Sequence, residues 1–157
     1  MKDHTPPWRF VLYTALIVMG LLATILTTAS LAQNGVTNRG VLKRMITMGI
    51  AKTAVGTLAK MMAGRIRFDR KVARAARKEL INATQLIPKL FRKPHGDPLS
   101  RASLKIWVSW DDFVIRAETA ERAARRLRIE RLEVLRKTLP DMLNACLSCH
   151  QTYRITR

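Results

Sequence analysis

The chain has 157 residues, of which 29 are Lys or Arg and 11 are Asp or Glu, so its formal net charge is +18. An apolar fraction of 48% excludes wholesale disorder, because disordered chains contain few large apolar residues. Aromatic residues make up 6% and there are seven glycines, which argues against a β-sandwich or barrel and leaves an all-α fold as the prediction.

The first 32 residues have the pattern of an export signal. Lys2 and Arg9 precede an apolar run over residues 10–26, and the small residues Ser30 and Ala32 stand where a signal peptidase reads. Extended to Ala32, the run is about 23 residues long, enough for a helix to cross a bilayer. A cleaved signal peptide and a retained transmembrane anchor both remain open. Either places the rest of the chain in the periplasm, where no nucleic-acid partner is expected.

A polar linker over residues 33–39 leads into the predicted domain, residues 40–157, in which no segment alternates like a strand. Apolar residues recur instead at helical spacing. The first stripe includes Val41, Met45 and Met48, and the second includes Val72, Ala76, Leu80 and Ala83. Two prolines and a glycine in residues 92–102 indicate the one long loop. The predicted helices span residues 40–63, 69–91, 103–128 and 130–154, and Pro140 should kink or split the last one. Their mostly short connections predict an antiparallel four-helix bundle.

The strongest chemical signal is the run Cys146-Leu147-Ser148-Cys149-His150. A C-x-x-C-H run is the attachment site of a c-type haem, because two thiols one turn apart reach both vinyl groups while the imidazole binds the iron. A disulfide, a zinc site and a thioredoxin-like site are the alternatives. Zinc needs more ligands than two cysteines, and the βαβ context of a thioredoxin-like site is absent. We therefore predict one covalently bound haem c.

The motif is followed by only seven residues, 151–157, and lies on the last helix of the predicted bundle. The order of motifs along residues 40–155 resembles the cytochrome c prime superfamily. The matching segments are Arg44 with Met48, Gly64 with Phe68-Asp69, residues 87–91, Ile106-Trp107 with Phe113, and residues 145–154. This resemblance implies a bundle whose C-terminal helix carries the haem.

The resemblance also implies roles for three further residues. Met48 would lie over the iron opposite His150, as in the low-spin branch of the superfamily, with Met45 as the substitute and plain core packing as the alternative. Arg44 would meet a haem propionate, although a solvated arginine is equally ordinary. Arg154 would tune the iron potential, although a cation near a helix C-terminus needs no such role.

The expected function is that of an exported electron carrier rather than an enzyme, since no hydrolytic residue set or phosphate-binding loop is present. A five-coordinate haem protein that binds NO or CO is the alternative, as is an anchored accessory subunit of a membrane redox complex. The charge predicts an acidic redox protein or an anionic membrane surface as partner, and the superfamily suggests a homodimer. Basic residues gather on the second predicted helix, at Arg70, Lys71, Arg74, Arg77 and Lys78. A second basic cluster, expected to steer docking, comprises Arg116, Arg122, Arg125, Arg126, Arg128 and Arg131.

Overall fold

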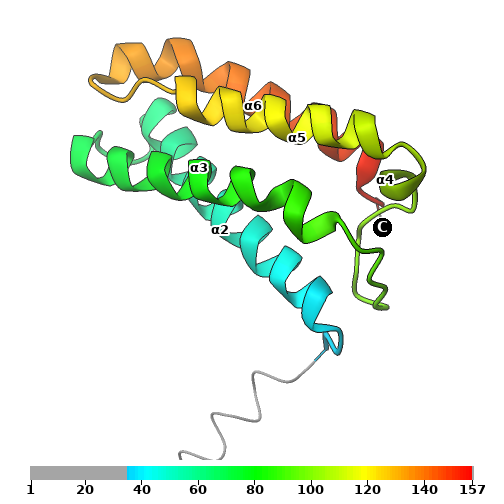
Figure 1. Ribbon diagram of the computed structural model, residues 1–157. Helices are drawn as coiled ribbons and strands as arrows, with labels where there is room; N and C mark the ends of the chain where they lie inside the picture. The colour runs from blue at the N-terminus through cyan, green and yellow to red at the C-terminus, as the bar shows by residue number, and fades with distance from the viewer. Residues whose placement is uncertain (1–34, 157) are drawn as a thin grey trace, which may run out of the picture. The chain divides into compact units, whose positions relative to one another are not determined.

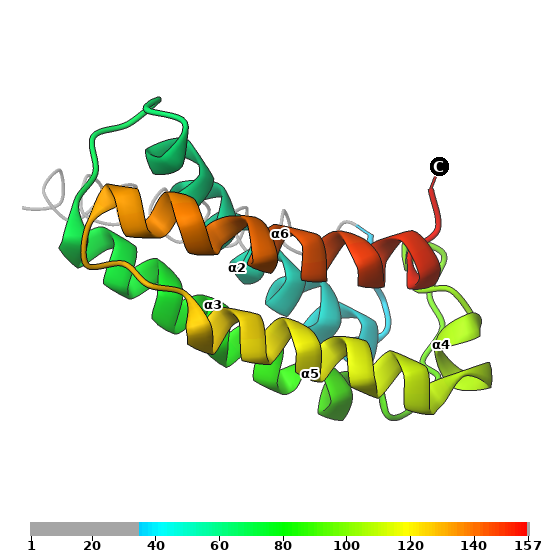
Figure 2. The same cartoon turned by 90° about the horizontal axis from the view of Figure 1, so that it is seen from above.

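The computed structural model describes residues 35–156, so the predicted export or anchor segment, residues 1–32, lies outside the described part. Four long helices and one short one follow in order: α2 (Arg39–Met62), α3 (Arg70–Phe91), α4 (Lys105–Val108), α5 (Trp110–Arg126) and α6 (Leu132–Tyr153). Consecutive long helices run antiparallel, and α2 also packs against α6 (Figures 1 and 2). The predicted antiparallel four-helix bundle is confirmed. None of the helices in residues 35–156 has the length and apolar character of a membrane span.

The ends of α2 and α3 follow local signals in the sequence. The Asn38 side chain accepts hydrogen bonds from the N–H groups of Gly40 and Val41, and the Asp69 side chain accepts one from the N–H of Val72. Gly64, predicted to end the first helix, has a positive φ of 69°, which a glycine adopts without steric cost. The first two helices therefore begin and end within a residue or two of the prediction.

The predicted third helix needs one correction, and the structure excludes one of the two alternatives given for the fourth. The third is split at Ser109, where φ −117° and ψ 54° separate α4 from α5. Contacts from distant residues accompany this break: the Tyr153 hydroxyl lies 3.3 Å from the Ser109 carbonyl oxygen, and the Trp107 indole donates to the Phe91 carbonyl. Periodicity along one segment cannot reveal such bonds. Pro140, in contrast, lies inside α6 at an exposed position and does not split the helix.

The core consists of two clusters, one at each end of the bundle. The first joins Leu58 and Met61 of α2 to Leu135 and Leu139 of α6. Figure 1 shows α2 and α6 close together at this end and diverging toward the other. The second, which we call the aromatic cluster, lies at the diverging end and comprises Ile87, Phe91, Ile106, Phe113, Ala117 and Tyr153.

The buried face of α2 differs from its predicted apolar stripe, whereas that of α3 differs at single positions only. Met45 and Val72 are 43% and 44% exposed, whereas Arg44 is only 3% exposed. An apolar pattern cannot include a buried arginine, so the predicted stripe on α2 is rotated away from the core face there. On α3 the predicted residues Ala76, Leu80 and Ala83 are buried, and Ala73 takes the place of Val72.

Gly40 lies in the first turn of α2, where a Cβ atom would meet the ring of His95. Alanine is normally the better helix former by about 1 kcal/mol, yet we expect Gly40→Ala to destabilise the fold by about 1–2 kcal/mol through overpacking. Urea unfolding measures the change. Gly49→Ala is the matched control, because a Cβ there meets nothing within 4 Å. Adding His95→Ala to the Gly40→Ala variant should restore stability, and no recovery would contradict the steric explanation.

Candidate haem-attachment site

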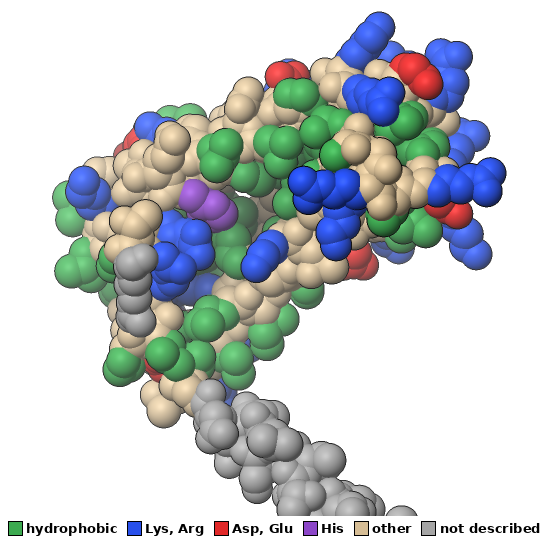
Figure 3. Space-filling view, turned by 180° about the vertical axis from the view of Figure 1, so that it is seen from behind, with side chains coloured by type: hydrophobic (Ala, Val, Ile, Leu, Met, Phe, Trp, Pro, Cys, Tyr) green, Lys and Arg blue, Asp and Glu red, His purple; other side chains and the backbone are tan. Residues whose placement is uncertain are grey.

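The C-x-x-C-H motif occupies the last two turns of α6, at the end of the bundle where α2 and α6 diverge. Cys146 and Cys149 are free, half-buried thiols one helical turn apart. Cys146 packs against the first core cluster and Cys149 against the aromatic cluster, so the pair bridges the two. The face formed by α2 and α6, seen in Figure 3, is hollowed, with hydrophobic side chains inside the hollow and a histidine and basic side chains around it. This arrangement suits a large, flat, apolar group with charged edges.

The acidity of the motif also fits haem attachment better than a redox-active cysteine pair. Burial raises the pKa of Cys146, and burial raises the pKa of Cys149 to about 11, so both remain thiols at neutral pH. A redox C-x-x-C motif lowers the pKa of one cysteine instead. Desolvation of the ring lowers the pKa of His150, and the charge of Arg154 lowers it further. His150 is therefore held as the neutral imidazole, the form that binds iron.

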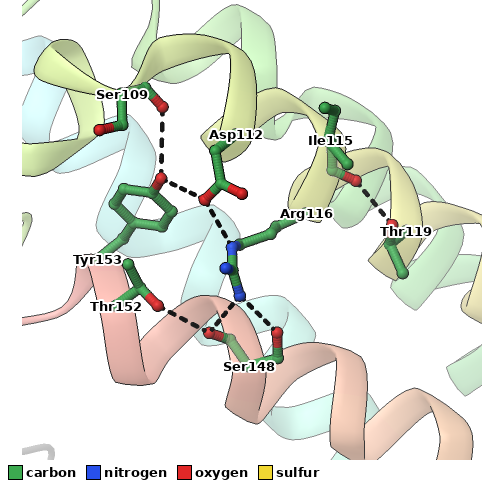
Figure 4. Close-up of polar contacts among 8 residues, drawn as sticks. All are labelled: Ser109, Asp112, Ile115, Arg116, Thr119, Ser148, Thr152 and Tyr153. Atoms are coloured by element: carbon green, nitrogen blue, oxygen red, sulfur yellow. Dashed lines mark hydrogen bonds and ion pairs between the residues drawn. The ribbon is translucent and has the colours of Figure 1, made fainter.

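A polar network from α5 holds the motif in place (Figure 4). Arg116 donates from Nε to Asp112 Oδ2 at 2.7 Å and from a terminal nitrogen to the Ser148 hydroxyl at 2.8 Å. The hydroxyl of Tyr153 donates to the same Asp112 oxygen at 2.5 Å. Ser148 stands between the two cysteines, so this network fixes the rotation and height of the attachment segment relative to α5.

The charge of Asp112 should make this network dependent on pH. Hydrogen bonds from Arg116 and then Tyr153 lower the pKa of Asp112 in the folded protein. A lowered folded pKa stabilises the fold above the unfolded value, about 3.9, and that contribution is lost as pH falls through the folded value. We expect Asp112→Asn to lower the urea midpoint at neutral pH, with the loss shrinking below pH of about 4. Asp141→Asn, an exposed change on α6, is the control; equal losses for Asp112→Asn at both pH values would contradict the coupling.

The structure brings Met48 to the same cluster as the motif. Met48 is half-buried on α2 and packs against the aromatic cluster, as Cys149 does from α6. Met45, the substitute ligand, is 43% exposed and belongs to neither core cluster. Of the two methionines, only Met48 packs against the cluster that Cys149 also contacts.

The two arginines named from the sequence have different surroundings. Arg44 is buried, and its three guanidinium nitrogens donate to the carbonyls of Leu90 at 3.0 Å, His95 at 3.1 Å, and Lys93. Its guanidinium also stacks over the rings of Phe91 and Trp107. Its contact with a propionate stays a prediction. Arg154 follows α6 directly, is exposed, and lowers the pKa of His150 through its charge.

The roles of Asp112 and Arg116 at the attachment site are not predicted from the sequence. Arg116 belongs to the second basic cluster, but four of the six arginines in that cluster form ion pairs with acids two or four residues away in the sequence. The ion pairs are Arg116–Asp112, Arg122–Glu118, Arg125–Glu121 and Arg128–Glu130. Three of these pairs have the i, i+4 spacing of a helix and are visible in the sequence. The hydrogen bond from Arg116 to Ser148 cannot be predicted from the sequence, because it depends on how α5 and α6 pack.

The family model described as Cytochrome C' matches residues 40–154. Solved structures with the same fold include cytochrome c' from Rhodopseudomonas palustris, at 23% identity and TM-score 0.69 over 77% of this chain and 99% of that one. Cytochrome c556 from R. palustris matches at 21% identity and TM-score 0.69 over 76% and 98% of the two chains. A nitric oxide complex of a cytochrome c prime variant from Alcaligenes xylosoxidans matches at 20% identity and TM-score 0.66 over 74% and 94%.

A search of curated proteins finds no match. The family match covers all four long helices together with the C-x-x-C-H motif. The chain belongs to the cytochrome c' family, whose members carry covalently attached haem c.

Proposed function

We propose that this protein is a periplasmic carrier of single electrons whose iron is bound by His150 and Met48. Cys146 and Cys149 would hold the haem as thioethers, and the bound haem would supply an iron centre that cycles between two oxidation states. The observation that carries this proposal is the position of Met48, which packs against the same aromatic cluster as Cys149. No other described methionine packs against that cluster.

The surrounding residues support this role in three ways. The aromatic cluster excludes water from one side of the site, which favours the less charged, reduced state. A thioether opposite imidazole also favours reduction and raises the potential. Arg154 adds a positive charge near His150, which acts in the same direction. We propose an acidic redox protein or a membrane redox complex as the partner; a permanently anchored subunit would depend on residues 1–32.

A five-coordinate haem protein that binds NO or CO is the second candidate. The comparisons favour this candidate over the first, since the chain belongs to the cytochrome c' family and one similar structure is a nitric oxide complex. In this case Met48 would be an apolar wall above the iron, and His150 would be the single protein ligand. The two candidates therefore differ in what the Met48 sulfur does.

An optical spectrum of the purified, reduced protein with and without CO distinguishes the two. Methionine ligation predicts a low-spin spectrum that CO changes little, because the sixth position is filled. A broad high-spin Soret band that shifts strongly with CO would contradict the electron-carrier proposal and support gas binding. Neither result depends on knowing the redox partner.

A further inference from the structure

The positive charge of the bundle is concentrated on one of its two helix layers. Helices α2 and α3, the lower layer in Figure 1, carry five and six basic residues, with Glu79 as their single acid. Helices α5 and α6 carry six basic and six acidic residues between them. We call α2 and α3 the basic layer. The net charge of the four long helices therefore lies entirely on this layer.

Most cations of the basic layer are exposed to solvent; of the eleven, Arg44 is buried and Arg77 is half-buried. Lys71, Lys78 and Lys89 are exposed on α3, on the side opposite the buried Leu80. Lys43 is exposed on α2. Acids on the other layer offset the arginines there through ion pairs, but Glu79 alone is available within the basic layer. This layer thus presents an uncompensated positive field.

Exposed aliphatic side chains lie on the same layer. Leu42, Ile46 and Ile50 follow one another at four-residue spacing on α2 and are 41%, 53% and 42% exposed. Leu86 on α3 is 43% exposed. The hydrogen bond from Arg44 to Leu90 indicates the antiparallel register, which places Leu86 at a level between Ile46 and Ile50. These four residues, the aliphatic strip, combine apolar area with the surrounding cations.

A groove of about 980 Å³ opens where α2 begins and α3 ends. Five cations line it, together with Asp111 and Glu118 of α5. The cations are Arg39, Lys43, Lys89, Arg92 and Lys93. A groove of this composition suits an anionic headgroup that is attached to an apolar chain.

We propose that the basic layer docks on an anionic phospholipid surface, with its cations among the headgroups and the aliphatic strip in the interface. Anionic lipid attracts basic side chains, and a cationic helix that also exposes aliphatic residues lies in the plane of the interface. A second copy of the chain would bring two uncompensated positive fields together. A soluble acidic partner would match the charge, but its acidic surface would not bury the aliphatic strip. The docked position leaves α5 free to meet a redox partner and does not depend on how the iron is ligated.

Lysine reactivity in the haem-loaded full chain tests this proposal. The chain is mixed with vesicles of phosphatidylcholine alone or of phosphatidylcholine with phosphatidylglycerol, then acylated with a water-soluble reagent and analysed by mass spectrometry. We expect anionic vesicles to lower the labelling of Lys43, Lys78 and Lys89 several-fold, while Lys105 and Lys137 stay reactive. Comparison within one chain removes any effect of residues 1–32, which would hold the chain at both kinds of vesicle. If anionic vesicles changed the labelling of all five lysines equally, the proposal would be overturned.

Charge reversal supplies the matched comparison. Lys43→Glu with Lys89→Glu should remove most of the several-fold protection of Lys78 by anionic vesicles, and Lys105→Glu with Lys137→Glu should leave it unchanged. Ile46→Ser with Ile50→Ser should also weaken protection, although the charge is unaltered. Protection that arises without vesicles and grows with protein concentration would assign the layer to a second copy and overturn the proposal. Unchanged protection in the Lys43→Glu and Lys89→Glu variant would overturn it as well.

Discussion

Replacing Arg44 by Met should lower the free energy of unfolding by about 3 kcal/mol, because three backbone carbonyls lose their donor together. Each buried carbonyl left without a partner costs about 1–3 kcal/mol, and loss of the stacking on Phe91 and Trp107 adds to this. The loop after α3 can open to water and recover part of the loss. The net effect is therefore expected near the lower end of the sum.

Urea unfolding of the haem-loaded protein measures this change. Arg44→Lys is informative because an ammonium group keeps the charge but lacks the planar fork that serves three carbonyls at once. It should lose most of the same stability. Lys43→Met is the control, since the neighbouring Lys43 is exposed. A loss for Arg44→Met no larger than that of Lys43→Met would contradict the role of Arg44 in closing the end of α3.

The buried position of Arg44 is a part of this fold that cannot be predicted from the sequence. Helix periodicity, the caps at Asp69 and Gly64 and the number of long helices could be predicted, because they depend on neighbours along the chain. The carbonyls that accept hydrogen bonds from Arg44 belong to residues 46 to 51 positions further along the chain. Their position depends on the path of the loop that follows α3. An inward arginine is therefore invisible to an apolar pattern, and the predicted stripe on α2 was rotated as a result.

The same distinction holds at the attachment site. Cys146, Cys149 and His150 form a contiguous motif with a chemical meaning of its own, so the sequence alone predicted haem attachment. The family match confirms this prediction, because members of the cytochrome c' family carry covalently attached haem c. The bond from Arg116 to Ser148 spans 32 residues and joins two helices. Arg116 could be counted as a cation from the sequence, but its position beside the motif required the packed bundle.

The second large effect is expected at Met48. Under the proposed ligation, Met48→Leu removes the sulfur from the iron while keeping nearly the same volume, so the cost in stability should stay below about 1.5 kcal/mol. The reduced protein should change from low spin to high spin. CO binding should rise from a small fraction to nearly complete, because the sixth position becomes open. The midpoint potential should fall, since the thioether no longer favours the reduced state.

Met45→Leu makes this measurement specific, because it removes a sulfur one turn earlier on the same helix, from a position that is 43% exposed. Its spectrum, CO binding and potential should match those of the unaltered protein. If instead Met45→Leu gives the high-spin change and Met48→Leu does not, the ligand is the other methionine. If neither variant alters the spectrum, both sulfurs are packing groups and the iron has His150 alone. That result would favour the five-coordinate, gas-binding candidate, with the Met48 side chain shaping the space that NO or CO enters.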